Sequence, residues 1–178
     1  MDKNIDMKVV QQTVNEILPN LNMYVRDVNL DSTLANKYKV GMIIREKGFT
    51  DASCRVMGMV TSHRYAILSN HMGDLREMEQ GTNWGLFVAQ RDAHFKVLDI
   101  YEYNGKIQIL LLHLPNDERW QIFENMKLSI EDDLVKDCRK RFEDKCDLEP
   151  IPELVKKDWL DRCEFPLGMS DEGEFFKL

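Results

Sequence analysis

The chain has 178 residues, a formal net charge of −7 at pH 7, 43% hydrophobic residues and 31% charged residues. This length fits one globular domain, residues 1–178, that buries a core without metal or disulfide support. The two signs of charge are interspersed with no basic stripe, which disfavours nucleic acid as a partner. No apolar leader opens the chain and no window approaches the ~18 apolar residues of a membrane helix, so we expect a cytoplasmic protein.

Cysteine usage also fits a reducing compartment. The spacing of Cys54, Cys138, Cys146 and Cys163 contains no C-x-x-C motif, and most of these residues lie on apolar faces of predicted helices. Such cysteines are typical of buried, reduced thiols in a cytosolic protein.

The first part of the chain is predicted to form a helix followed by short strands. Apolar residues recur at helical spacing from Asp6, which can cap the helix, to Leu18, and Pro19 ends it. Residues 23–25 and 40–44 are short strand candidates separated by polar, turn-prone residues.

The strongest local signal is a β-hairpin centred on Asn104 and Gly105. Both residue types tolerate the positive φ angles of a type I′ turn, and apolar strands are predicted at residues 95–103 and 106–114. Counting outward from the turn gives the predicted pairs Tyr101 with Gln108, Asp99 with Leu110, and Val97 with Leu112. Both faces of this hairpin are apolar in the middle, as in strands that are covered on two sides.

Two further segments extend the hairpin into a larger predicted sheet. Apolar runs within residues 54–70 predict a second hairpin, and residues 84–90 predict a strand that pairs with residues 95–103. The polar connection at residues 71–83 has room for one helical turn. The expected sheet is an antiparallel meander of about five or more strands.

After Pro115 the apolar spacing becomes helical. A short helix capped by Asn116, a helix from Ser129 to about Lys145 and a third helix that begins near Pro152 are predicted. With the N-terminal helix, the chain is expected to be an α+β protein with a helical C-terminal third. The helices can share one sheet face or divide between two, and a homodimer is an alternative cover for the second face.

Common cofactor and metal motifs are absent from the sequence. It contains no Gly-rich dinucleotide motif, P-loop, H-E-x-x-H, G-x-S-x-G or EF-hand loop. The separations of His63, His71, His94 and His113 match no compact metal signature. We therefore expect no cofactor and no metal.

Asp99 is a carboxylate within an apolar strand. In the predicted register Trp84, Tyr101 and Gln108 lie one step along the same face, and together they form a candidate buried polar site. A buried carboxylate needs donors, because leaving it charged and unpaired costs several kcal/mol. A structural hydrogen bond to Gln108, a tyrosine or a backbone amide is the first interpretation, and a catalytic or ligand role is the alternative.

The connection at residues 71–83 is the candidate binding surface. Its charged residues surround two apolar side chains, an arrangement common at recognition sites. The candidate residues are Asp74, Leu75, Arg76, Glu77, Met78 and Glu79. A solvated connection with one helical turn has the same composition.

Two functional hypotheses follow from these observations. The first is a non-enzymatic, acidic cytoplasmic protein that binds another protein, such as a toxin-neutralising immunity protein or an inhibitor of a basic partner. The second is a small cofactor-independent enzyme, a hydrolase or transferase, with a pocket near Asp99 or the loop from His71. The absence of catalytic motifs favours the first hypothesis.

Overall fold

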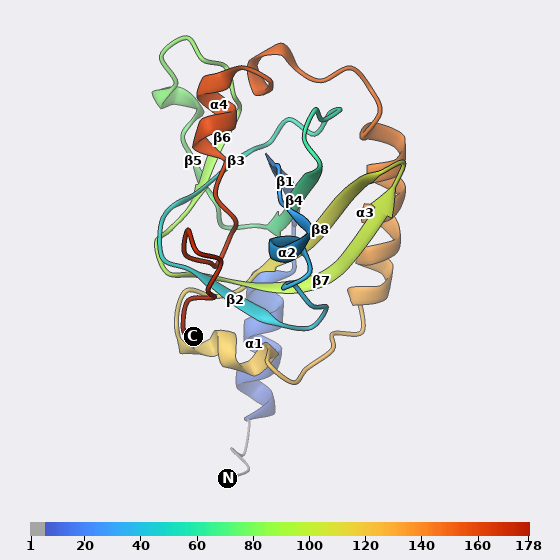
Figure 1. Cartoon of the computed structure of the whole chain (residues 1–178). Helices are drawn as coiled ribbons and strands as arrows, with labels where there is room; N and C mark the ends of the chain where they lie inside the picture. Colours follow the sequence, from blue (N-terminus) through green and yellow to red (C-terminus); the bar gives the residue numbers. More distant parts are fainter. Residues whose placement is uncertain (1–5) are drawn as a thin grey trace.

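One mixed sheet of eight strands organises residues 6–178, the part of the chain that the computed structural model describes (Figure 1). The strand order is β2-β7-β8-β4-β1-β3-β6-β5. β4 and β8 run parallel, and the other strand pairs of the described residues are antiparallel. The protein is therefore an α+β protein with a mostly antiparallel sheet.

The longest elements are α1, β7 and α3, and the others have eight residues or fewer. The strands are β1 Asn22–Val28, β2 Ile43–Glu46, β3 Thr50–Ser53, β4 His63–Ser69, β5 Gly73–Asp74, β6 Leu86–Ala89, β7 Ala93–Tyr103 and β8 Lys106–His113. The α-helices are α1 Met7–Ile17, α2 Ser32–Ala35, α3 Glu131–Lys145 and α4 Lys157–Arg162. Short 3-10 helices are η1 Arg76–Met78, η2 Glu118–Phe123 and η3 Pro152–Leu154.

Several local predictions in the first part of the chain are confirmed. The Asp6 carboxylate caps α1 by accepting from the backbone N–H of Lys8 at 2.9 Å, and the helix ends before Pro19. Residues 23–25 lie inside β1, whereas residues 40–44 supply only the beginning of β2.

The predicted meander was wrong. β6 pairs with β3 and β5 rather than with β7, and β2 occupies the position beside β7. The sheet also contains a parallel pair, which no meander has. Turn signals and apolar alternation are local, whereas the choice of strand partner depends on contacts between residues far apart in sequence.

The predicted hairpin within residues 54–70 was also wrong, because only its second half forms a strand. The first half leaves the sheet and reaches the end of α3, where the Met59 N–H donates to the Cys146 carbonyl at 3.4 Å. Gly58 lies so close to this turn that a Cβ atom there would be 1.7 Å from the carbonyl oxygen of Leu148. A close backbone contact has overridden the local strand propensity of this segment.

The turn between β7 and β8 is confirmed. Asn104 and Gly105 have φ angles of 49° and 75°, as a type I′ turn requires. The observed pairs that match the prediction are Tyr101 with Gln108 and Asp99 with Leu110. A bulge between Val97 and Asp99 then shifts the register, so that Val97 faces Leu111, one residue short of its predicted partner.

Replacing Gly105 by Val is expected to lower the free energy of unfolding by about 1 kcal/mol, because a β-branched residue is strained at positive φ. Nothing lies within 4 Å of a Cβ atom built at Gly105, so the loss would report backbone strain alone. Urea unfolding of Gly105→Val and Gly105→Asn tests this, since Asn tolerates positive φ. Equal stability of the two variants would contradict the interpretation.

Separate hydrophobic clusters cover the two faces of the sheet. On one face Val25 and Leu110 pack in a cluster with residues of α1, η2 and α3. On the other face Tyr65 and Phe95 pack with residues of α2 and with Leu167 from the C-terminal segment. Figure 1 shows α2 in front of the sheet and α1 behind it. Both faces of the central strands are therefore buried within one chain.

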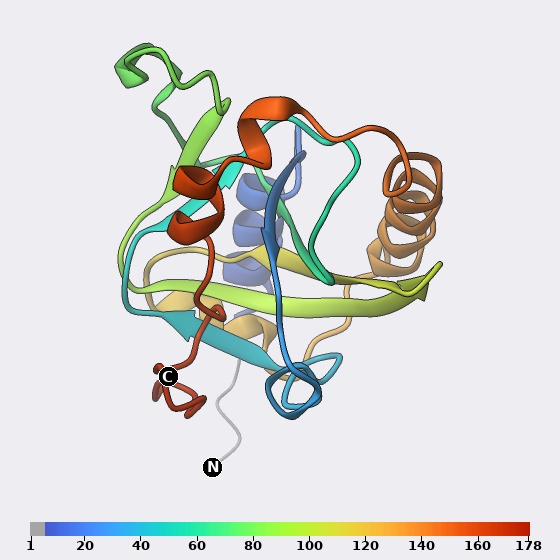
Figure 2. The same cartoon turned by 45° about the horizontal axis from the view of Figure 1, so that its top comes forward.

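The C-terminal third is only partly helical. Asp117, not Asn116, caps η2, and the chain after α4 forms a turn-rich segment with a bridge between Met169 and Phe175. This segment lies beside β2 in both views (Figures 1 and 2). Positive φ angles at Gly168 and Gly173, together with a proline, are incompatible with a continuing helix. No helix in residues 6–178 is long and apolar enough to span a bilayer.

Candidate functional site

Asp99 is buried, with 6% exposure, and forms a bidentate ion pair with Arg139 of α3. Nε and Nη2 of the guanidinium lie 2.8 and 2.7 Å from the two carboxylate oxygens. The sequence predicted a glutamine, a tyrosine or a backbone amide as the partner. The structure supplies an arginine instead, because α3 covers this face of β7.

The other residues predicted around this aspartate are divided between two places. The Tyr101 hydroxyl donates to Glu143 of α3 at 2.5 Å, and Gln108 donates to a backbone carbonyl of the same helix at 3.5 Å. Trp84 lies elsewhere, with its ring centroid 5.4 Å from that of Trp159 in α4. It was misplaced in the prediction because β6 does not pair with β7. The aspartate, the tyrosine and the glutamine all join the sheet to α3.

Asp74, Arg76 and Glu79 of the predicted binding loop form contacts within the protein. Asp74 accepts two hydrogen bonds from the guanidinium of Arg76, which lower the pKa of this carboxyl to about 2. Glu79 accepts from the backbone N–H of Leu86 at 2.5 Å. The Glu79 contact joins the loop to β6.

The apolar centre expected in that loop is divided as well. Leu75 is half-buried and packs beside Trp159, whereas Met78 is 74% exposed. Glu77 is exposed. Binding through this loop stays a prediction.

The histidines do not assemble a site with Asp99. His71 stacks on His113 with ring centroids 3.9 Å apart and lines a cavity of ≈ 500 Å³, while Asp99 lines a separate cavity of ≈ 470 Å³. His94 stacks on Trp120 at 4.6 Å. Within residues 6–178 no group of three or more His, Cys, Asp or Glu side chains is placed to hold a metal ion.

A cavity that the sequence reasoning missed lies where β1, β2 and β3 meet α4 and the C-terminal segment. Its volume is ≈ 290 Å³. The side chains that line it from the sheet and from α4 are Arg26, Glu46, Phe49, Asp51, Arg162 and, just after the helix, Phe165. We call it the Arg26 cavity.

Arg26 lines this cavity from β1 as an incompletely paired cation. It lies in β1 between the buried residues Tyr24 and Val28 of the same face and is 6% exposed. Its Nη1 donates to the carbonyl of Asp51 at 3.2 Å, and its Nε is buried without a hydrogen-bond partner in the described part of the chain. None of the ion pairs formed within residues 6–178 includes it.

The carboxylates of the cavity are already engaged. Glu46 accepts the backbone N–H groups of Gly48 and Gly168, both at 2.8 Å. Asp51 accepts from Nη1 of Arg162 at 2.7 Å. Two carboxylates therefore line the same cavity as Arg26, and no ion pair within residues 6–178 joins either of them to it.

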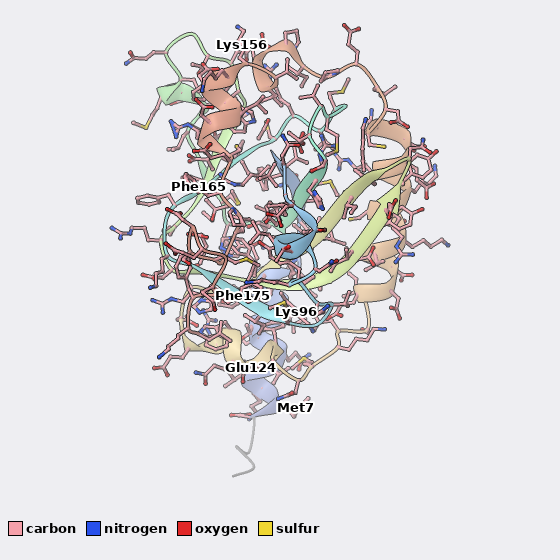
Figure 3. All side chains as sticks on the ribbon, viewed as in Figure 1. Met7, Lys96, Glu124, Lys156, Phe165 and Phe175 are labelled. Atoms are coloured by element: carbon pink, nitrogen blue, oxygen red, sulfur yellow. The ribbon has the colours of Figure 1, made fainter. Side chains whose placement is uncertain are left out.

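Two phenylalanines give the cavity an aromatic rim. Phe49 and Phe165 line it and are 64% and 50% exposed, unusually high for large apolar rings. Figure 3 shows Phe165 on the segment that leaves α4, on the same side of the molecule as Phe175.

One signal in the sequence could have pointed to this cavity. Arg26 interrupts the apolar run of β1 on a face shared with two buried residues, the same kind of anomaly that drew attention to Asp99. The opposite walls, from residues 46–51 and 162–176, meet Arg26 only in the folded chain.

No protein-family model and no curated protein sequence matches the chain. Among solved structures, the ADP-ribosyltransferase HopU1 of Pseudomonas syringae pv. Tomato DC3000 is 16% identical with a TM-score of 0.46, over 53% of this chain and 45% of that one. Exoenzyme S from Pseudomonas aeruginosa, solved bound to Carba-NAD, is 12% identical with a TM-score of 0.46, over 65% of this chain and 57% of that one. Vis toxin, an ADP-ribosyltransferase from Vibrio splendidus, is 15% identical with a TM-score of 0.43, over 61% and 55%.

The chain spans about half the length of these structures. Likeness at this level of identity and TM-score assigns no activity to the chain. The finding nevertheless contradicts the first functional hypothesis, since HopU1 and Vis are described as ADP-ribosyltransferases, Vis also as a toxin, and none of the three as an immunity protein or an inhibitor. A non-enzymatic, toxin-neutralising binding protein was the wrong prediction.

Proposed function

We propose that the chain is an enzyme that binds a nucleotide in the Arg26 cavity, with Arg26 holding a phosphate group. The observation that carries this proposal is the buried, incompletely paired guanidinium at the cavity wall. Arginine does not lose its proton in proteins, so a buried arginine needs an anion or several acceptors. Its planar fork of N–H donors fits the oxygens of a phosphate.

The aromatic rim favours a nucleotide over a bare phosphate. Phe49 and Phe165 expose their rings at the same cavity, and stacking a base on an aromatic ring contributes about 1 to 3 kcal/mol. A ligand with one anionic end and one flat aromatic end uses both features.

The carboxylates of the cavity favour chemistry at the sugar. Glu46 and Asp51 line the same space as Arg26. A carboxylate beside a sugar ring stabilises the positive charge that develops when a glycosidic bond breaks. The reaction class we propose is therefore cleavage or transfer of the glycosyl group of a nucleotide. ADP-ribosyl transfer, named in the descriptions of HopU1 and Vis toxin, belongs to this class.

Calorimetric titration with ADP and with NAD tests the proposal. We expect both to bind, and Arg26→Gln to weaken binding about tenfold to a hundredfold, because it removes a charge-assisted contact. Arg26→Lys keeps the positive charge but loses the planar set of N–H donors. Its affinity for each nucleotide should lie between that of the wild type and that of Arg26→Gln. Chromatography of NAD incubated with the protein then reports release of the free base.

Arg119→Gln is the matched control. Arg119 is ion-paired with Glu16 and Asp117 at the surface, outside the Arg26 cavity, so this variant should bind like the wild type. Circular dichroism at matched temperature confirms that each variant is folded. The proposal would be refuted if the folded wild type bound neither nucleotide. It would also be refuted if Arg26→Gln bound the nucleotides as tightly as the wild type does.

A further inference from the structure

Cys54 differs from the other cysteines of the chain because it is not buried. Cys138, Cys146 and Cys163 are buried, and burial raises the pKa of each thiol. Cys54 follows β3 directly and is half-buried. Reaction at a cysteine requires access to the sulfur and loss of the thiol proton. Cys54 is therefore the cysteine best placed to react with a small molecule.

Cys54 lines a cavity of ≈ 530 Å³, here called the Cys54 cavity, which shares no lining residue with the Arg26 cavity. The cavity lies where β3 ends at Ser53, opposite Val25, so that residues 22–24 of β1 have a described strand partner on one side only. Its other walls come from β5, β6 and α3. Pockets for small molecules usually measure about 300 to 1,000 Å³. The cavity is therefore large enough for an organic ligand beside the thiol.

Close packing against Gly85 restricts the position of the Cys54 sulfur. The Cys54 N–H donates to the Gly85 carbonyl at 2.9 Å, and a Cβ atom built at Gly85 would lie 2.9 Å from Sγ. Gly85 has a φ angle of 67°, which few residues with a side chain adopt. A glycine is therefore required where the backbone approaches the thiol.

The charged residues that line the Cys54 cavity are one carboxylate, Asp74, and two arginines, Arg76 and Arg141. Arg76 donates two hydrogen bonds to Asp74, so these two charges offset each other. Arg141 is an exposed residue of α3, and none of the ion pairs formed within residues 6–178 includes it. An uncompensated positive charge at the cavity attracts anionic ligands.

Tyr24 supplies a hydroxyl donor at the same cavity. The residue is 5% exposed, and its ring centroid lies 4.6 Å from that of Phe87. Burial raises the pKa of the phenol, and the neighbouring Cys54 and Asp74 raise it further. Its hydroxyl forms no hydrogen bond within residues 6–178. A buried tyrosine normally pairs its hydroxyl, so this group is available to donate to an oxygen of a ligand.

We propose that Cys54 is a site of reversible thiol–disulfide exchange with a small acidic disulfide, whose carboxylate is attracted by Arg141 and accepts a hydrogen bond from Tyr24. The half-buried thiol, the free cation and the unpaired hydroxyl all line one cavity of sufficient volume. This proposal does not depend on nucleotide binding in the Arg26 cavity.

The exchange needs no oxidant other than the disulfide itself. The Cys54 thiol loses its proton to solvent, and the sulfur attacks one sulfur of the disulfide. A new S–S bond joins Cys54 to one half of the reagent while the original S–S bond breaks. The other half leaves as a thiolate, which takes up a proton. Cys54 is thereby oxidised and the leaving half is reduced.

Exchange rates with three disulfides of different charge test the proposal. The probes are dithiodipropionate, which is anionic, hydroxyethyl disulfide, which is neutral, and cystamine, which is cationic. Mass spectrometry of the folded protein follows adduct formation, and each rate is divided by that of N-acetylcysteine methyl ester to remove the intrinsic reactivity of the disulfide. We expect the relative rate with dithiodipropionate to exceed that with cystamine by about fivefold or more at low ionic strength, and the difference to shrink with salt.

Two variants test the residues that attract the carboxylate. Arg141→Gln should lower the rate with dithiodipropionate about threefold to tenfold, because it removes the free positive charge. Its rate with hydroxyethyl disulfide should change by less than about twofold. Tyr24→Phe keeps the ring and should lower the rate with dithiodipropionate about twofold to tenfold, through loss of one hydrogen bond.

Lys136→Gln is the matched control. It removes another exposed cation of α3, one that does not line the Cys54 cavity, and all three rates should stay within about twofold of the wild type. Cys54→Ser should form no adduct. Equal relative rates with the three disulfides, no adduct at Cys54, or equal losses in Arg141→Gln and Lys136→Gln would each overturn the proposal.

Discussion

Replacing Gly58 by Ala is expected to lower the free energy of unfolding by about 3 kcal/mol or more. A Cβ atom at this position would lie 1.7 Å from the carbonyl oxygen of Leu148 and 2.6 Å from its carbonyl carbon. Backbone atoms cannot rotate away as a side chain does, so the segment at residues 55–62 and the turn after α3 would have to separate. Urea unfolding measures the loss.

Gly48→Ala is the control for this substitution. Its added Cβ atom meets only the carboxylate oxygen of Glu46, at 3.3 Å, which a flexible side chain can relieve. We expect a change within about 0.5 kcal/mol. If Gly58→Ala cost no more than Gly48→Ala, the close contact between the two backbones would be refuted.

The elements that sequence reasoning placed correctly are those set by neighbours in the chain. Asp6 caps α1 through a residue two positions away, and Asn104 with Gly105 sets a turn by its own backbone angles. The bulge at Val97 and the parallel pairing of β4 with β8 depend on distant packing. Neither has a local signal in the sequence.

The same division holds for the sites. A carboxylate in an apolar strand required a partner, and Asp99 has one, but Arg139 lies 40 residues away on a helix whose docking was not predictable. The rule for charged residues on buried faces applies equally to Arg26. Its significance becomes visible only in the folded chain, where Asp51 and the segment after α4 line the same cavity.

Lowering the pH from 7 to 5 is expected to destabilise the protein through His113. This side chain is 1% exposed, and burial, with a smaller contribution from the charge of His71, lowers its pKa to about 3. In the unfolded chain the pKa is about 6.5. Between these two values the unfolded state binds a proton that the folded state does not, so stability is full above pH 6.5 and falls as the pH decreases. From pH 7 to pH 5 the loss from this group is about 2 kcal/mol.

The variant His113→Gln isolates this contribution, because glutamine keeps hydrogen-bonding capacity toward Ser69 but does not titrate. The free energy of unfolding of the wild type should fall by about 2 kcal/mol more than that of the variant between pH 7 and pH 5. Burial also lowers the pKa of His63, His71 and His94, so the variant should still lose some stability. Carboxylates with lowered pKa values lose their contribution only below about pH 4.5, outside this window. Parallel pH profiles for the two proteins would show that His113 is protonated in the folded state and that its burial does not exclude the charged form.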